Sequence, residues 1–305
     1  MNNRTISVLI LTHNEEINLP DCLASLSSLD AEIFIVDSHS TDATAEIAKR
    51  YGAAVYSHDF LNQAQQVNWA IGNLPMRGDW ILRLDADERL TPELAAELAS
   101  GLREFPEGIN GLYCRRRVIF MGRWIKHGSY YPTWLLRVWR SGKAVCEERW
   151  MDEHMILKEG RAASLKWDIS EDNGKDLSWW ILKHNSYATR EMIEFFRQGE
   201  GVSVGGKRVA EAVLDTQEKR KRWLKNNVYN KLPLFFRPLI YFVYRYFLRF
   251  GFWDGREGLI FHFLQGFWYR FLVDAKIHEF RRRAQREGKA PAALLKELYN
   301  VGQRD

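Results

Sequence analysis

Short apolar runs alternate with helical segments along the first hundred residues of the chain. Ile6–Leu11, Glu32–Val36 and Trp80–Leu84 are apolar runs of the length that is typical of buried parallel strands. Leu19–Leu29 has a leucine at every third or fourth position, which is typical of a helix with one apolar face. Asn62–Ile71 has the pattern of another helix, with a polar face. This alternation predicts an α/β fold with a mostly parallel, doubly wound central sheet, right-handed crossovers and flanking helices.

Two carboxylates one residue apart, Asp85 and Asp87, close the run that begins at Trp80. In extended backbone both side chains would face the same side, with Arg83 expected on the opposite one. Ligands of open α/β sheets bind at the carboxyl ends of strands. Mg²⁺ and Mn²⁺ take oxygen ligands, and Mg²⁺ is usually held by one or two carboxylates plus substrate phosphates. The motif predicts a metal-bridged diphosphate, and the plain alternative is a strand-end cap.

Charge is distributed unevenly along the chain. The formal net charge is +5, yet residues 205–305 hold 21 Lys and Arg against 10 Asp and Glu, and the residues before them are acidic on balance. A basic last third predicts an anionic surface as its partner, either a membrane or a nucleic acid.

The residues from Leu232 to Ala275 are dense in aromatic side chains, interrupted by Arg237, Arg245, Arg249 and Arg270. A spanning helix is not expected, because an arginine at the bilayer centre costs roughly 2.5–3.5 kcal/mol. Helices that lie in the membrane interface fit better, with aromatics at the headgroup boundary and arginines on anionic lipid. The alternative is a helical bundle packed on the main domain. Nucleic acid is not an expected partner, because the aromatics cluster as apolar faces rather than as spaced stacking platforms.

The three cysteines, Cys22, Cys114 and Cys146, lack the spacing of a metal or redox site. Met1–Thr5 leads straight into a predicted strand, with no signal-peptide pattern. Both observations predict a reducing compartment, and hence a cytoplasmic protein.

Four separated motifs resemble those of the family 2 glycosyltransferases, which have the GT-A fold. They are Leu11–Glu15, Val36–Asp42, Leu84–Glu88 and the late acidic pair Asp152–Glu153. Their order and spacing are more specific than any one motif. The resemblance implies a GT-A catalytic domain for nucleotide sugar and acceptor over residues 1–200. Residues 201–305 would then form a basic, aromatic-rich helical region that associates with the membrane.

Within that family the chain resembles the branch that adds sugars to lipopolysaccharide core or related surface glycans. This resemblance rests on Met121–Ile125, Tyr131-Pro132, Leu136-Arg137, Lys183–Asn185 and Gly251–Gly255. It implies an inverting, metal-dependent transferase that moves a hexose from a UDP-linked donor such as UDP-glucose. The acceptor would be a glycolipid or lipid-linked saccharide of lipopolysaccharide core, exopolysaccharide or capsule synthesis. The protein would then lie in the cytoplasm, peripheral to the inner membrane.

The resemblance implies roles for the residues that follow the first two strands. Thr12, Asn14 and Glu15 would line the nucleotide cleft, and Asp37 would accept hydrogen bonds from the uracil or the ribose. A carboxylate suits that role because it is a pure acceptor that forms strong charge-assisted bonds. Asp42 is interpreted as the cap of the next helix.

At the Asp-x-Asp motif, Asp85 would bind the ribose and Mg²⁺ or Mn²⁺, and Asp87 would be the more direct metal ligand. The metal would neutralise the leaving diphosphate. His184 would complete the metal shell or contact the diphosphate, since neutral imidazole is a competent ligand. The alternative for a lone histidine on a helix is a structural role.

An attacking sugar hydroxyl needs a base opposite the diphosphate. In the core-glucosyl members the late acid stands in a Val-His-Glu pattern, whereas this chain has Met151-Asp152-Glu153-His154. The base role is therefore open between Asp152 and Glu153, and we choose Glu153, with Asp152 orienting it or binding the acceptor. The alternative for this segment is a solvated loop.

Residues 111–150 are predicted to be rich in β-strands, aromatic and basic. Cations among aromatics suit sugar stacking and phosphate binding. An anionic acceptor, such as a phosphorylated inner-core sugar, would lie among basic side chains of this region, namely Arg115, Arg117, Lys126, His127 and Arg137. A solvated β-ribbon face is the alternative.

Other functions remain as alternatives. One is a polyprenyl-phosphate sugar transferase, and another is a non-catalytic, membrane-peripheral nucleotide-binding scaffold. A phosphatase with an aspartate nucleophile also has Asp-x-Asp at a strand end, but Glu88 and Arg89 follow the motif here where that class has Thr or Val. Oligomeric state, the sugar transferred and the acceptor hydroxyl are not predicted by the sequence.

Overall fold

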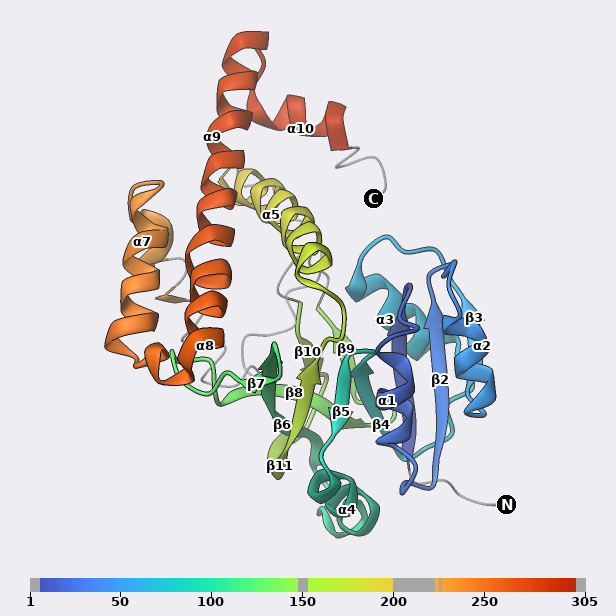
Figure 1. Ribbon diagram of the computed structural model, residues 1–305. Helices are drawn as coiled ribbons and strands as arrows, with labels where there is room; N and C mark the ends of the chain where they lie inside the picture. Colours follow the sequence, from blue (N-terminus) through green and yellow to red (C-terminus); the bar gives the residue numbers. More distant parts are fainter. Residues whose placement is uncertain (1–5, 148–152, 200–222, 225–226, 300–305) are drawn as a thin grey trace. The chain divides into compact units, whose positions relative to one another are not determined.

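The computed structural model describes residues 6–147, 153–199, 223–224 and 227–299. These residues divide into two compact units, the first ending at Lys175 and the second beginning at Asp176 (Figure 1). The expected domain division at residue 200 differs from this boundary, because the helix that precedes residue 200 packs within the second unit.

The first half of the first unit alternates strands and helices as the apolar pattern predicts (Figure 1). Strands β3, β2, β1 and β4 lie side by side in that order and are parallel. Asn62 and Thr91 cap the helices that follow them, accepting hydrogen bonds from Gln65 N at 2.9 Å and Leu94 N at 3.3 Å. The elements are β1 Ile6–Thr12, α1 Leu19–Ala24, β2 Ala31–Asp37, α2 Thr44–Arg50, β3 Ala54–Ser57, α3 Gln63–Asn73, β4 Trp80–Asp85, β5 Glu88–Leu90, α4 Pro92–Gly101 and the short η1 Leu102–Glu104.

The second half of the sheet corrects the prediction of a mostly parallel sheet. Strand β8 pairs antiparallel with both β4 and β6, β11 pairs parallel with β6, and β5 joins β11 antiparallel. The sheet is therefore mixed, because the segment after α4 returns as neighbouring strands without a crossover helix between them. These strands are β6 Ile109–Phe120, β7 Arg123–Trp124, β8 Thr133–Arg140 and β11 Arg161–Asp172, with a separate antiparallel pair, β9 Ala144–Cys146 and β10 Met155–Leu157.

Side chains alternate between two buried layers on the two faces of the sheet. Val8, Ile10 and Leu84 pack with α1, α2 and α4 in one layer. Leu9 and Ile81 pack with α3, β9 and β10 in the other. Odd-numbered residues of β4 therefore face α3 and the β9–β10 pair, which determines the surroundings of Arg83 and Asp85.

The second unit is helical. Helix α5 lies along α9, and Met192, Phe196, Val273, Ile277 and Phe280 form much of their shared core (Figure 1). No helix among the described residues is long and apolar enough to cross a membrane. The elements are α5 Leu177–Gly199, η2 Tyr229–Lys231, α7 Phe236–Val243, η3 Tyr244–Leu248, η4 Gly251–Asp254, α8 Gly255–Phe261, η5 His262–Trp268, α9 Tyr269–Glu287 and α10 Pro291–Tyr299.

Three of the four arginines that were expected on anionic lipid are engaged inside this unit. Arg237 is 3% exposed and its Nε donates to Asp274 Oδ1 at 2.8 Å. Arg245 is 2% exposed and donates to Gln265 Oε1 at 2.7 Å. Arg270 donates to Glu191 Oε1 at 3.0 Å. The expectation is wrong for Arg237 and Arg245, because a buried guanidinium needs a partner within the fold, whereas Arg270 pairs with Glu191 while 21% exposed.

Candidate active site

The carboxyl ends of β1, β2 and β4 meet at one edge of the sheet. Thr12 lies opposite Asp37, and Leu11 opposite Asp85, in the parallel register of these strands. The predicted residues at the ends of β1, β2 and β4 therefore come together at the edge where open α/β sheets bind their ligands.

Asp37 organises the first two loops of this edge. Its Oδ1 accepts hydrogen bonds from Thr12 Oγ1 at 2.8 Å and from Ser40 Oγ at 2.5 Å, and its Oδ2 accepts one from Ser40 N at 2.8 Å. Ser40 Oγ in turn accepts from Asn14 N at 2.8 Å, and Asn14 Oδ1 accepts from Thr41 N at 2.8 Å. Asp37 is 4% exposed, so these bonds satisfy a carboxylate that has little access to water.

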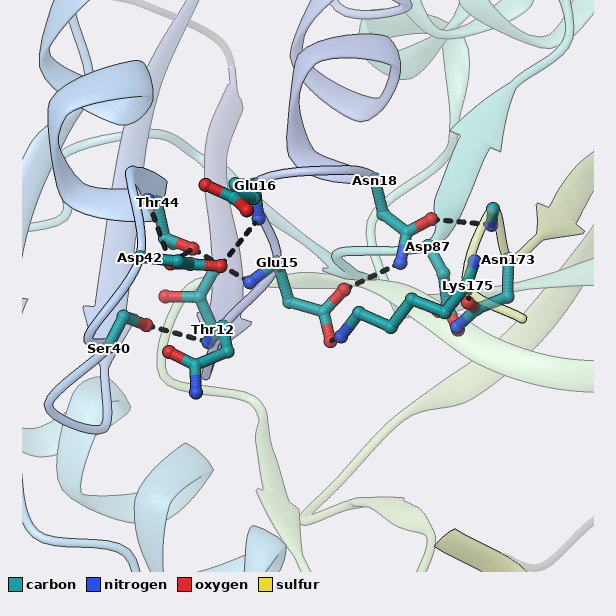
Figure 2. A network of polar contacts seen from close by, with 12 residues as sticks. Thr12, Glu15, Glu16, Asn18, Ser40, Asp42, Thr44, Asp87, Asn173 and Lys175 are labelled. Carbon is teal, nitrogen blue, oxygen red and sulfur yellow. Dashed lines mark hydrogen bonds and ion pairs between the residues drawn. The ribbon is translucent and has the colours of Figure 1, made fainter. Parts of the chain in front are cut away.

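Asp42 was interpreted as the cap of the second helix, but Ala43 occupies the N-cap position of α2, and Asp42 instead braces the turn before the helix. Its Oδ1 accepts hydrogen bonds from Thr44 N at 3.0 Å and Thr44 Oγ1 at 2.5 Å, and its Oδ2 accepts one from Glu16 N at 3.2 Å (Figure 2). Burial would raise the pKa of Asp42, but these hydrogen bonds outweigh it and lower that pKa below its ordinary value. Thr44 Oγ1 also accepts from Glu15 N at 2.7 Å, which ties the two loops together.

Asp85 is already compensated by two arginines. Arg137 Nη2 donates to Asp85 Oδ2 at 2.7 Å and to Glu88 Oε1 at 2.5 Å, and Arg83 Nη2 lies 3.4 Å from Asp85 Oδ1. Burial would raise the pKa of Asp85, but Arg137 and Arg83 outweigh it and hold that pKa well below its ordinary value. For Glu88, which is 1% exposed, burial raises the pKa above its ordinary value despite Arg137, and the charge of Asp85 adds to the rise.

These contacts correct two predictions. Arg137 was expected to bind the acceptor, but it is 5% exposed and held between Asp85 and Glu88, because a buried carboxylate pair requires a cation. Arg83 was expected on the opposite side from Asp85, yet residues two apart on a strand share a face, and the two side chains meet.

Asp87 lies outside the strand and has different partners. Strand β4 ends at Asp85 and a turn follows at residues 86–87, so the two carboxylates are not related by the period of a strand. Asp87 Oδ2 accepts a hydrogen bond from Asn173 Nδ2 at 2.8 Å (Figure 2). Among the described residues, no cation lies within ion-pair distance of Asp87, although arginines hold Asp85.

The segment after β11 forms a third wall of this edge, which sequence reasoning missed. Lys175 Nζ donates to Glu15 Oε1 at 2.8 Å, Asn18 Nδ2 donates to Glu15 Oε2 at 2.7 Å, and Gly174 N donates to Asn18 Oδ1 at 2.8 Å (Figure 2). The pairing of β11 with β5 brings these residues beside Asp87. No local pattern predicts that pairing, because the two strands lie about eighty residues apart in the chain.

Glu153 lies two residues before β10, whereas Asp152 lies outside the described residues. Asn68 of α3 holds the end of β9, donating to Cys146 O at 2.9 Å and accepting from Cys146 N at 2.8 Å. The side chain of Gln63, at the start of α3, lies 2.6 Å from Glu153 Oε1. The side chain of Gln63 thus lies between Glu153 and the cluster of Asp85 and Arg83.

Two of the predicted acceptor cations share a buried carboxylate. Arg115 Nε lies 2.8 Å and Arg117 Nε 2.5 Å from Asp168, which is 1% exposed and also accepts from Tyr131 Oη at 3.0 Å. Two cations on one anion leave a positive charge in excess. Arg117 also stacks over the ring of Trp124, its guanidinium 4.8 Å from the ring centre, and Lys126 Nζ lies 5.2 Å from the same ring.

His184 belongs to the second unit. Its ring stacks on Trp180 with the centres 3.4 Å apart, and its Nδ1 donates to Trp180 O at 2.9 Å. Burial lowers the pKa of His184 to about 4. The ring is therefore neutral near pH 7, and these contacts account for it as part of the helix packing.

The donors at this edge fit a divalent cation only in part. Among residues 6–147, 153–199 and the described remainder, no group of three or more His, Cys, Asp or Glu side chains is placed to hold a metal ion. Asp87 offers carboxylate oxygen without a cationic partner. A carboxylate or two completed by diphosphate oxygens and water is the common form of a Mg²⁺ site, so the residues present fit a metal that binds with its nucleotide.

The sequence matches known proteins along most of its length. Residues 7–154 match the family described as Glycosyl transferase family 2. The lipopolysaccharide core biosynthesis glycosyltransferase LpsC of Rhizobium meliloti is 30% identical over 281 residues, which cover 90% of this chain and 92% of LpsC. An uncharacterized glycosyltransferase of Rickettsia typhi is 37% identical over 95 residues, covering 31% of this chain and 32% of that protein.

Among solved structures, the chain is 26% identical to glucosyl-3-phosphoglycerate synthase from Mycobacterium tuberculosis, in complex with Mn²⁺, uridine diphosphate and glucosyl-3-phosphoglycerate. The TM-score is 0.30, with 37% of this chain and 44% of that chain covered. The similarity to LpsC extends over nearly the whole of both chains. The chain therefore belongs to the family 2 glycosyltransferases.

Proposed function

We propose that this glycosyltransferase moves a hexose from a UDP-linked donor to an anionic glycolipid with inversion, using a divalent cation. The observation that carries the proposal is the pattern of charge at the strand edge. Arg137 compensates Asp85, and Lys175 compensates Glu15, whereas Asp87 contacts only the neutral amide of Asn173 among the described residues. Of the two carboxylates of the Asp-x-Asp motif, Asp87 is thus the one whose charge is available to a cation.

Asp87 would hold that cation, with Asp85 near it. When bound, the metal would act as a Lewis acid that neutralises the charge developing on the leaving diphosphate. The hydrogen bond from Asn173 to Oδ2 fixes the Asp87 carboxylate before the nucleotide arrives.

The two loops tied together by Asp37 would hold the nucleotide. A carboxylate has about four lone-pair sites, and three of those on Asp37 are used by Thr12 and Ser40. One site therefore remains for a donor such as the uracil N–H or a ribose hydroxyl. Asn14 and Glu15 would line the same cleft.

Glu153 would remove the proton from the attacking hydroxyl, with Asp152 as the alternative base. A base and a leaving group on opposite sides of the anomeric carbon produce inversion in one displacement. The acceptor would reach this point past Arg115, Arg117 and Lys126, whose excess positive charge beside Trp124 suits a phosphorylated sugar.

The second unit would bind the membrane interface. Its helices α7 and α8 and the turns between them expose large apolar side chains, among them Leu239, Phe247, Leu248 and Trp253, which are 49%, 53%, 66% and 59% exposed. Exposed apolar surface of this density marks an interaction site. The basic excess of residues 205–305 favours an anionic lipid surface as the partner. Because Arg237, Arg245 and Arg270 are engaged within the fold, apolar insertion would supply most of the affinity.

The experiment that tests the donor and metal is a thermal-shift series with UDP, GDP and CMP, each with and without Mn²⁺. A ligand bound only by the native state at 100 times its Kd stabilises that state by about 2.7 kcal/mol. We expect UDP to raise the melting temperature only with Mn²⁺, and Asp87→Asn to lose that rise. Asp59→Asn, at a side chain that is 96% exposed, is the matched control. An equal rise in Asp87→Asn, or one without metal, would overturn the metal role of Asp87.

A further inference from the structure

Two amide side chains of helix α3, Gln63 and Asn68, contact Glu153 and the end of β9. Asn68 makes a donor and an acceptor bond to the backbone of Cys146, which is 1% exposed at the end of β9. Glu147 N donates to His154 O at 2.9 Å and continues the β9–β10 pairing past that point. The backbone at Cys146, Glu147 and His154 is therefore anchored. Gln63, on the same helix as Asn68, places its amide at the side chain of Glu153.

The orientation of the Gln63 amide follows from its neighbours. One end of the amide lies 2.6 Å from Glu153 Oε1, and the other contacts Arg83 Nη2 and lies 3.3 Å from Asp85 Oδ1. A carboxylate only accepts and a guanidinium only donates, so the amide nitrogen must face Glu153 and the amide oxygen must face Arg83. In this orientation the two short contacts are hydrogen bonds. The reverse would gain only the longer bond to Asp85 and would set acceptor against acceptor at Glu153 and donor against donor at Arg83.

Arg83 is suited to hold the amide oxygen of Gln63 in place. It is 5% exposed, lies on the same face of β4 as Asp85, and sits 3.4 Å from Asp85 Oδ1. Its strand is buried in the sheet, so the guanidinium is a rigid point of attachment. A cation that polarises the Gln63 amide strengthens the hydrogen bond that the amide donates to Glu153.

We propose that Gln63 is the positioning residue of the catalytic base, holding one carboxylate oxygen of Glu153 on a rigid chain that runs through Arg83 to β4. This inference rests on the proposed function, because it takes Glu153 as the base. It assigns to Gln63 a role that acts only through Glu153. The structural reason for a rigid hold is that a base displaced by about 1 Å loses on the order of a hundredfold in rate.

The first test is a double-mutant cycle on UDP release from UDP-glucose, with rough-type lipopolysaccharide as acceptor. Gln63→Met keeps the side-chain length and removes the amide, and should lower kcat about 100-fold while the Kd for UDP with Mn²⁺ stays within about twofold. Glu153→Gln should lower kcat about 100- to 10,000-fold. The double variant should be no slower than Glu153→Gln, because residues that act as a unit are not additive. Gln65→Met, at an exposed glutamine of the same helix, should match the wild type.

A second measurement does not depend on the donor. The side-chain amide of Gln63, assigned by the signal that Gln63→Met loses, should shift in the ¹⁵N–¹H spectrum of Glu153→Gln and should stay in place in Glu147→Gln. An unshifted signal in Glu153→Gln would overturn the inference, and so would additive losses in the cycle or a weakened UDP affinity in Gln63→Met. Full activity of Glu153→Gln with a shifted amide would instead refute Glu153 as the base and leave the contact standing.

Discussion

Arg137 provides the sharpest test of how this edge of the sheet is built. Replacing it by Met keeps much of the apolar stem and removes the guanidinium that joins Asp85 to Glu88 at 2.7 and 2.5 Å. Asp85 would retain Arg83, at 3.4 Å. Glu88, 1% exposed, would keep only the hydrogen bond from Asp85 N at 2.9 Å. The change therefore leaves one buried carboxylate without its cation.

The expected loss in the free energy of unfolding follows from this broken ion pair. Breaking a buried ion pair by removing one partner costs about 3–5 kcal/mol. The lower end, about 3 kcal/mol, applies here because Asp85 keeps a cation and Glu88 can take up a proton. In a unit of this size that loss lowers the melting temperature by roughly 6–12 °C. Arg137→Met combined with Glu88→Gln should recover at least about 1 kcal/mol, because the neutral amide leaves no charge buried.

The assay is urea unfolding followed by hydrogen exchange of peptides from β1 and β4, which report on the first unit alone. Lys126→Met, an exposed cation of the same unit, is the control and should change the unfolding free energy by less than about 0.5 kcal/mol. If Arg137→Met changed that free energy by less than about 1 kcal/mol and only weakened acceptor binding, the guanidinium would be a binding group and our reasoning on the buried cluster would fail.

Two further predictions concern the second unit. Phe247→Glu with Leu248→Glu should lower the fraction bound to vesicles of phosphatidylethanolamine and phosphatidylglycerol at least about tenfold, because burying each apolar side chain in the membrane contributes roughly 1.5–3 kcal/mol. Leu61 is an exposed leucine of the first unit, so Leu61→Glu should bind as the wild type. Unchanged sedimentation of the double variant with the vesicles would remove the membrane role of this surface. The pKa of His184 is lowered to about 4 in the folded state, against about 6.5 in the unfolded state. The neutral His184 ring therefore contributes fully to stability above pH 6.5, and this contribution is lost as the pH falls toward 4, at about 1.4 kcal/mol per pH unit. Urea unfolding at pH 7.5 and 5 should show that loss in the wild type and a smaller one in His184→Phe, which keeps the stack on Trp180, and equal losses would contradict the burial of the ring.

Much of the fold was predictable because its signals are local. The apolar runs that became β1, β2 and β4 are short and bounded, and the caps at Asn62 and Thr91 bond to backbone three residues away. The strand-end motifs were predictable for the same reason, since neighbouring parallel strands end at one edge. The four-motif pattern identified the family, and the similarity to LpsC confirmed it.

The charge partners of the site were not predictable in that way. Glu15 meets Lys175 and Asp87 meets Asn173 only because β11 pairs with β5, and Asp85 meets Arg137 only because β8 pairs with β4. No periodicity records which distant strand becomes a neighbour.

The amino-acid sequence by itself determined the alternating architecture, the strand ends at which ligands bind and the family. The tertiary structure alone decided which of the charged side chains are already neutralised. Of Asp85 and Asp87, equivalent carboxylates in the motif, one is held by arginines from two strands and the other by a neutral amide. The arginines of the aromatic segment, similar in sequence, divide into Arg237 buried on Asp274 and Arg249 exposed. The physical reason is that a charge acquires its role from partners and burial, and both are set by contacts between residues far apart in the chain.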